Sequence, residues 1–179
     1  LYGSPLWGSY VLGVAGVLGA LMERRPLSLH IFNNMLRKLA KEHQPPYIAA
    51  VFESGEPTHR TQEFADYKAN RAETPPDLLE QIPHIERILH AMRIPILQYP
   101  GFEADDVIAT LARRAVEQGF RVVIVSGDKD FTQIVGEHVR MYDSMTDKHT
   151  GPEEVRARYG VGPERMAEYL SLLGDSVDN

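Results

Sequence analysis

The apolar residues of this chain follow two spacings, one typical of helices and one typical of short buried strands. Segments with an apolar residue every three or four positions are 31–43, 76–93 and 104–119. Uninterrupted apolar runs lie within 47–52, 94–100 and 122–125. Runs of that length predict strands covered on both faces, as in parallel sheets. Gly119 follows the third helical segment and is a candidate C-terminal cap.

The second half of the chain continues the alternation. A short helix is expected at 131–136, a strand at 138–143, and two further helices at 151–160 and 162–175, each opening near a Gly-Pro pair. Alternating strands and helices predict an α/β protein with a mainly parallel central sheet flanked by helices. We expect residues 1–179 to form a single domain, because this length suffices for one hydrophobic core.

The composition of the chain excludes some classes of function but says little more about the fold. The net charge of −6 argues against a domain that coats DNA through charge alone, although DNA binding stays possible if the acids surround metal ions. Cysteine is absent, which fits a reducing cytoplasm and leaves no thiol chemistry. The longest apolar run, 11–22, is too short to span a bilayer, so we expect no membrane association. Because the chain begins with Leu1 instead of Met, we expect a fragment.

Carboxylates gather where the predicted strands end. In open parallel sheets, binding sites form beyond the carboxyl ends of the strands. Magnesium prefers oxygen ligands, and two such ions about 4 Å apart can clamp the attacking and leaving oxygens of a phosphodiester. The pattern therefore predicts a metal-dependent phosphodiesterase site. The candidate ligands are Glu53, Glu103, Asp105, Asp106, Asp128, Asp130, Asp175 and Asp178.

A structural explanation competes with the metal site for each acidic group taken alone. Acids in the first turn of a helix meet unpaired N–H groups and the positive end of the helix dipole. Asp130 is the acid most readily explained as a cap, because it precedes the helix predicted at 131–136, and Asp105 could cap its own helix. Three or four acidic clusters, all at predicted sheet ends, favour the metal site over unrelated caps.

Four stretches resemble a known family. They are EFADYKANR (63–71), GFEADDVIATLA (101–112), VSGDKDFTQIV (125–135) and YGVGPERMAEYLSLLGDSVDN (159–179). Together they resemble the 5′→3′ exonuclease domain of bacterial DNA polymerase I, in the flap endonuclease family with its PIN-like fold, over about 31–179. The resemblance implies metal-dependent hydrolysis of DNA at 5′ ends and flaps in primer removal and repair. It also implies a cytoplasmic, nucleoid-associated bacterial protein whose parent can carry a polymerase domain.

The resemblance also implies roles for single residues. The acids from Glu103 to Asp178 named above would surround two divalent cations, Mg²⁺ or Mn²⁺. Arg60, Tyr67, Lys68 and Arg71 would meet the DNA strand, with Lys68 and Arg71 in catalytic positions. A phosphate that reaches a metal site needs cationic side chains to hold it, which agrees with this assignment. The alternative for the basic residues is a solvated surface loop.

The chain departs from the family in three places. The family's first strand ends in an Asp-Gly pair, whereas Ala15 stands here, and residues 1–29 match poorly. Glu53 stands where the family has Asp, and the Gly-rich helix–hairpin–helix segment that follows in the family is missing. A shifted reading frame or divergence would explain residues 1–29. The departures keep open a second hypothesis, a catalytically impaired DNA-binding fragment that lost a metal ligand at Ala15.

Two further classes are less favoured. Other Mg²⁺ phosphoesterases and phosphotransferases of doubly wound type need an Asp nucleophile after the first strand, and the first 60 residues contain no Asp. A PIN-type ribonuclease would share the chemistry, but the YKANR and GDSVDN stretches favour a DNA-directed enzyme.

Overall fold

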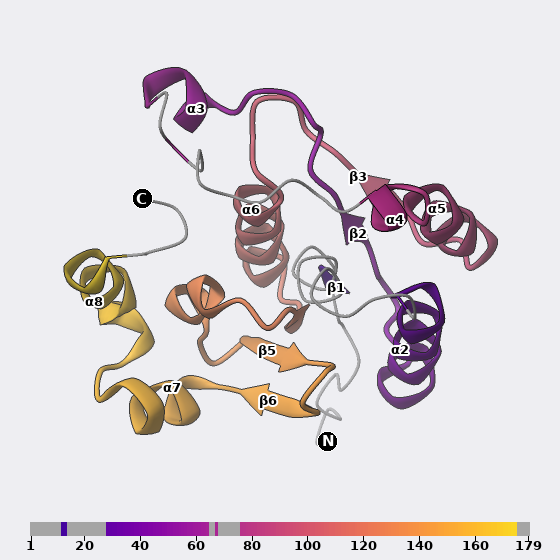
Figure 1. Cartoon of the computed structure of the whole chain (residues 1–179). Coiled ribbons are helices and arrows are strands. Elements are labelled where there is room, and N and C mark those ends of the chain that lie inside the picture. The colour runs from indigo at the N-terminus through magenta and orange to yellow at the C-terminus, as the bar shows by residue number, and fades with distance from the viewer. Residues whose placement is uncertain (1–11, 14–27, 65–66, 68–75, 175–179) are drawn as a thin grey trace, which may run out of the picture.

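A mainly parallel sheet lies between two groups of helices (Figure 1). The computed structural model describes residues 12–13, 28–64, 67 and 76–174. The larger sheet has the order β1 (Leu12–Gly13), β4 (Val122–Val125), β5 (Val139–Asp143) and β6 (Lys148–Thr150). Its first three strands are parallel and β6 is antiparallel. A second parallel pair joins β2 (Ala50–Val51) to β3 (Ile96–Leu97).

Strand β4 is buried on both faces. Val123 and Val125 point into one apolar cluster, and Val122 and Ile124 point into another. Successive side chains of a strand alternate between faces, so one strand can serve both clusters. This explains why 122–125 reads as an unbroken apolar run. The prediction of a mainly parallel α/β sheet is confirmed.

Helices α2 (Ser28–His43) and α5 (Ile82–Ala91) cover one face of the sheet. Helix α2 contributes Phe32, Leu36 and Leu39, and α5 contributes Leu89, at the three- and four-residue spacing that places side chains on one side of a helix. Full burial of such a side chain stabilises the fold by roughly 1.5–3 kcal/mol. The apolar spacing seen in the sequence thus corresponds to the core-facing stripes of these helices.

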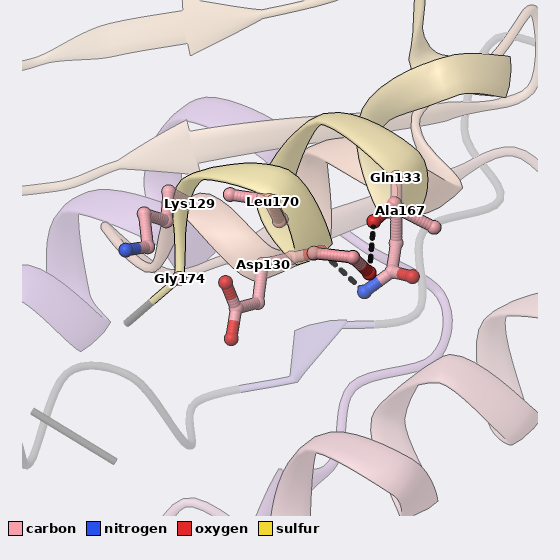
Figure 2. A pocket seen from close by; sticks show the side chains of 7 residues that line it. Lys129, Asp130, Gln133, Ala167, Leu170 and Gly174 are labelled. Atoms are coloured by element: carbon pink, nitrogen blue, oxygen red, sulfur yellow. Dashed lines mark hydrogen bonds between the residues drawn. The ribbon is translucent and has the colours of Figure 1, made fainter. Parts of the chain in front are cut away.

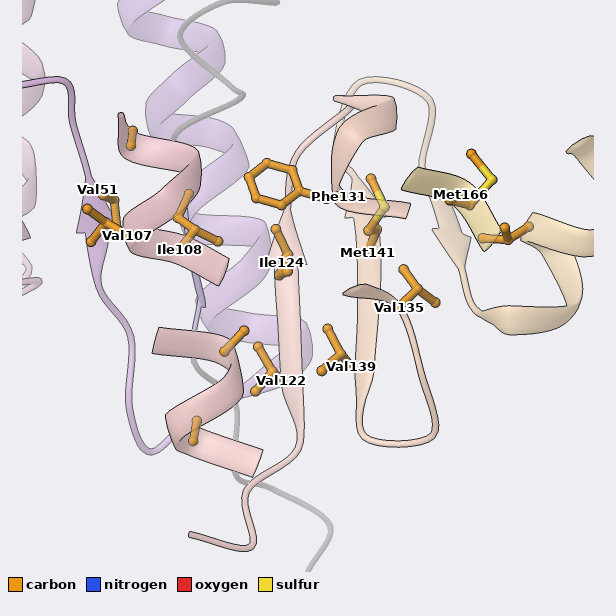
Figure 3. Close-up of a cluster of buried hydrophobic side chains, with 14 residues drawn as sticks. Val51, Val107, Ile108, Val122, Ile124, Phe131, Val135, Val139, Met141 and Met166 are labelled. Carbon is orange, nitrogen blue, oxygen red and sulfur yellow. The ribbon is translucent and has the colours of Figure 1, made fainter. Parts of the chain in front are cut away.

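The other face is covered by helix α6 and the C-terminal elements (Figure 3). These elements are α6 (Ala104–Glu117), the 3₁₀ helix η1 (Lys129–Ile134), α7 (Pro152–Tyr159), η2 (Pro163–Arg165) and α8 (Met166–Leu173). Gly119 follows α6 with a φ of +84°, in the left-handed region that favours glycine. Gln118 is the C-cap residue of α6, and Gly119, which was predicted to be the cap, closes the helix one position after it.

Several element boundaries differ from the prediction. The helix expected at 76–93 is two helices, α4 (Pro76–Leu79) and α5, and Pro83 lies in the first turn of α5, where its missing N–H costs nothing. The two strands expected at 47–52 and 94–100 are each two residues long. The helix expected at 131–136 begins earlier, at Lys129.

The described elements that were not predicted include a short helix and a short strand. Helix α3 (His59–Glu63) has no buried residue, and β6 has only exposed or half-buried side chains. Neither therefore has the apolar periodicity from which the other elements were predicted. Within the described part of the chain, every helix is too short or too polar to cross a lipid bilayer.

Candidate active site

Strands β2 and β3 bring two acidic side chains to the same end of the fold. The Phe52 amide donates to the Leu97 carbonyl at 2.9 Å and keeps the two strand ends together. Glu53 follows directly, and its Oε1 accepts a hydrogen bond from the Ala104 amide at 3.2 Å, in the first turn of α6. Glu103 is the N-cap residue of that helix. A carboxylate beyond β2 therefore contacts the helix that follows β3.

Arg60 joins the acids at this helix end. Its Nη1 lies 2.7 Å from Asp106 Oδ2 and 3.2 Å from Glu103 Oε2, and its Nη2 donates to Asp106 Oδ1 at 2.8 Å. Glu53, Glu103 and Asp106 are called the acidic cluster below. The Tyr67 hydroxyl also donates to Glu103 Oε2, at 3.4 Å. Residues predicted to hold metal and residues predicted to meet DNA thus lie side by side.

Electrostatics explains how these groups coexist. The Glu103 side chain is only 9% exposed, and a buried carboxylate requires partners, which Arg60 and Tyr67 provide. Hydrogen bonds from the Arg60 guanidinium hold the pKa of Asp106 below its ordinary value. The Asp106 carboxylate in turn raises the pKa of Arg60. Both partners of this pair are therefore charged at neutral pH.

Asp105 belongs to the first turn of α6 and is not its cap. Glu103 holds the N-cap position, so the alternative that Asp105 caps its own helix is wrong. Asp105 and Asp106 both lie where the helix dipole favours negative charge.

The cap of η1 is Asp128, whereas Asp130 was the acid expected to be a cap. The carboxylate of Asp128 accepts a hydrogen bond from the Asp130 amide at 2.9 Å and caps η1. Asp128 is thus the cap, and the alternative that Asp130 would fill this role is wrong, because η1 begins at Lys129. Asp130 lines a hollow of about 260 Å³ between η1 and α8, beside Gln133 and Leu170 (Figure 2).

One acid at the same edge of the sheet was missed by the sequence analysis. The carboxylate of Asp143, at the end of β5, lies beside Gly127, about 3.7 Å from where a Cβ would stand on that glycine. It accepts hydrogen bonds from the Met145 amide at 2.9 Å and the Thr146 hydroxyl at 2.6 Å, which close the turn into β6. The signal was available, because Asp143 also ends a predicted strand.

Several predicted site residues lie outside the described part of the chain. They are Lys68, Arg71, Asp175 and Asp178, together with Ala15. Their assignments stay predictions.

The donor chemistry of the acidic cluster fits a hard divalent cation. Glu103 and Asp106 direct carboxylate oxygens at one positive group, and Mg²⁺ and Mn²⁺ prefer oxygen ligands. Among the residues described, however, no three acidic, histidine or cysteine side chains are arranged to hold a metal ion. In this conformation, Arg60 supplies the positive charge between the two acids.

Solved structures with the same architecture define the class. The bacteriophage T5 D15 protein, co-crystallised with metal ions, superposes with a TM-score of 0.76 and 20% identity, over 95% of this chain and 68% of that one. The catalytic core of Rad2, in complex with a DNA substrate, gives a TM-score of 0.58 and 18% identity, over 97% of this chain and 56% of that one. The fold is therefore that of the PIN-like 5′ nucleases.

Sequence comparison places the chain within that class. It belongs to the family of the 5′-3′ exonuclease, N-terminal resolvase-like domain, whose model matches residues 23–160. A 5′-3′ exonuclease of Aquifex aeolicus is 43% identical over 152 residues, which make up 85% of this chain and 53% of that protein. DNA polymerase I of Bacillus caldotenax is 41% identical over 83% of this chain and 17% of its own length. The chain thus spans about half of the first relative and about a sixth of the second.

Proposed function

We propose that this chain is a structure-specific 5′ nuclease that hydrolyses DNA phosphodiesters at 5′ ends and flaps with divalent cations. The observation that carries the proposal is the meeting of Glu103, Asp106 and Arg60 at the N-terminus of α6, inside the span that matches the exonuclease family. Carboxylates provide cation ligands there, and a cationic side chain suited to phosphate lies within hydrogen-bond distance of them.

The residues of this chain have separate tasks in the proposed reaction. Bound cations would supply an activated water and charge neutralisation at the leaving oxygen. Glu103 and Asp106 would hold them, with Glu53, Asp105, Asp128, Asp130, Asp175 and Asp178 as the further predicted ligands. Arg60, Tyr67, Lys68 and Arg71 would orient the DNA strand at the acids. We propose two ions, Mg²⁺ or Mn²⁺, and roles in primer removal and repair.

The parent protein is also part of the proposal. Residues 1–179 would form one nuclease domain, and the polymerase relatives suggest a polymerase domain elsewhere in the parent chain. We propose a cytoplasmic location at the bacterial nucleoid.

Cleavage of a 5′-flap DNA tests the proposed activity. We expect Mg²⁺- or Mn²⁺-dependent release of the flap that EDTA abolishes. Glu103→Gln should lower the rate at least about tenfold, because it removes a charged ligand. Glu117→Gln is the matched control. It removes the same charge at the other, exposed end of α6, and we expect it to leave the cleavage rate unchanged.

A second candidate, a DNA-binding domain without catalysis, is favoured by Ala15 and by the arginine between the acids. Flap binding without cleavage by the wild type and by Ala15→Asp, in folded protein, would establish it and overturn the nuclease proposal. Cleavage restored by Ala15→Asp alone would locate the defect at that position.

A further inference from the structure

Helix α3 is held over the acidic cluster by polar contacts. It has five residues, none of them buried, and no side chain in the described structure caps its N-terminus. It lies beyond the N-terminal end of α6 (Figure 1). The His59 amide donates to the Gly101 carbonyl at 3.1 Å, and Arg60 bonds the acids. Arg60 is therefore the contact through which the acidic cluster influences the position of α3, beside the His59 contact with Gly101.

Arg60 and a divalent cation need the same oxygens. The guanidinium uses both carboxylate oxygens of Asp106, at 2.7 and 2.8 Å, and its Nη1 lies 3.2 Å from Glu103. A cation bound by Glu103 and Asp106 would meet the guanidinium charge within a few ångströms, where like charges repel strongly in a partly buried site. The two positive groups therefore compete for the acidic cluster.

We propose that Arg60 is an exchangeable counter-ion of the acidic cluster. It neutralises Glu103 and Asp106 when no divalent cation is bound, and it leaves them when a cation binds. Its departure removes one of the contacts that hold α3 and frees a bidentate donor for a DNA phosphate. Arg60 is thus a positioning residue that couples cation binding to substrate binding. The inference rests on the proposed function only in that the cluster binds divalent cations.

Thermodynamic linkage determines whether Arg60 raises or lowers the affinity of the cluster for a cation. If a cation weakens the docking of α3, docked α3 must weaken cation binding by the same factor. A bidentate, partly exposed ion pair corresponds to roughly a three- to tenfold change in an equilibrium constant. Removal of the arginine should therefore tighten cation binding by about that factor.

Calorimetric titration of the DNA-free protein with Mn²⁺ tests the exchange. We expect Arg60→Gln to bind Mn²⁺ about three- to tenfold more tightly than the wild type, and Arg60→Lys to fall between them, because lysine keeps the charge but loses the fork. Arg113→Gln removes the same charge from the exposed far part of α6 and should match the wild type. Glu103→Gln should weaken binding, which locates the titrated site at the cluster.

Nuclear magnetic resonance can follow the Arg60 guanidinium and the α3 backbone directly, through their N–H signals. In cation-free protein the Arg60 guanidinium N–H signals should be protected by the Asp106 contact, and Mg²⁺ should abolish that protection. Mg²⁺ should also speed exchange of the His59 amide, and Arg60→Gln should do so without the ion. Arg113→Gln should change neither signal before Mg²⁺ is added.

The outcomes separate this inference from the proposed function. Equal Mn²⁺ affinity of the wild type and folded Arg60→Gln, or Arg60 signals that persist in saturating Mg²⁺, would overturn the exchange. Cation-dependent flap cleavage would then still support the nuclease. Absence of Mn²⁺ binding in every variant would overturn both proposals.

Discussion

At the scale of single residues, Asp128 combines a structural contact with a predicted chemical role. Its carboxylate caps η1 through the Asp130 amide at 2.9 Å, and it follows β4 at the same edge of the sheet as Asp143. A cap needs an oxygen acceptor, whereas a cation ligand needs the negative charge as well. Substitutions that keep or remove each property can therefore separate the two roles.

We predict that Asp128→Ala loses about 1 kcal/mol of unfolding free energy, because the cap is lost. Asp128→Asn should keep wild-type stability, because the amide oxygen still accepts the hydrogen bond. Both variants should cleave flap DNA more slowly. Urea denaturation and the cleavage assay measure the two effects. If Asn destabilises the protein as much as Ala, the charge and not the cap supports η1.

The Arg60–Asp106 contact predicts a pH dependence. The pKa of Asp106 in the folded protein lies below the ordinary value of 3.8. The contact therefore stabilises the folded protein fully at pH values above 3.8. This contribution is lost as the pH falls through the lowered pKa. In cation-free Arg60→Gln, the pKa of Asp106 should rise from its wild-type value, as carbon-13 titration of the carboxyl group would show. An unchanged pKa would mean that another group sets it.

The acids at strand ends could be proposed from the sequence, but the pairing of Arg60 with Asp106 could not. These residues are 46 positions apart. Their contact depends on where α3 lies, and α3 has no apolar pattern from which to place it. The cap of η1 by Asp128 in place of Asp130 likewise depends on a helix boundary, which apolar spacing determines only to within a few residues.

At the scale of elements, apolar spacing predicted the helices that pack on the sheet. Helices α2 and α5 meet through fully buried side chains such as Leu36 and Leu89, and the same side chains produce the three- and four-residue spacing. Elements without a buried face, α3 and β6, left no such spacing and were missed. Elements of this protein that bury apolar side chains could therefore be predicted from the sequence, and elements that bury none could not.

Leu89→Ala on α5 should lower the unfolding free energy by about 2–5 kcal/mol, because it leaves a cavity in a fully buried position. Leu172→Ala on α8 makes the same chemical change at a side chain that is 90% exposed, and it should stay within about 0.5 kcal/mol of the wild type. Thermal and urea denaturation compare the two. A large loss from Leu172→Ala would mean that this leucine is covered in solution.

At the scale of the whole molecule, β4 connects the two apolar clusters. Its side chains alternate between the α2 face and the α6 face, and β5 does the same with Tyr142 on one face and Met141 on the other. The sheet is therefore shared by both halves of the core. Loss of packing on one face of the sheet should therefore lower the stability of the helices on the other face.

We predict that Ile124→Val, on the α6 face, costs about 0.5–1.5 kcal/mol and lowers the hydrogen-exchange protection of α2 and α6 together. The physical reason is that both helices pack on the strand that is weakened. Exchange measured by mass spectrometry in the wild type and the variant tests this. Loss of protection in α6 alone would show that the faces open independently.

The surface position of α3 also bears on how this protein can change by mutation. Because none of its five residues is buried, substitutions there, Arg60 apart, remove little core packing. The four side chains of β4 are all buried and have no such freedom. A segment proposed to meet DNA can therefore vary while the buried sheet stays constant, so new substrate preferences could arise at α3 without loss of the fold.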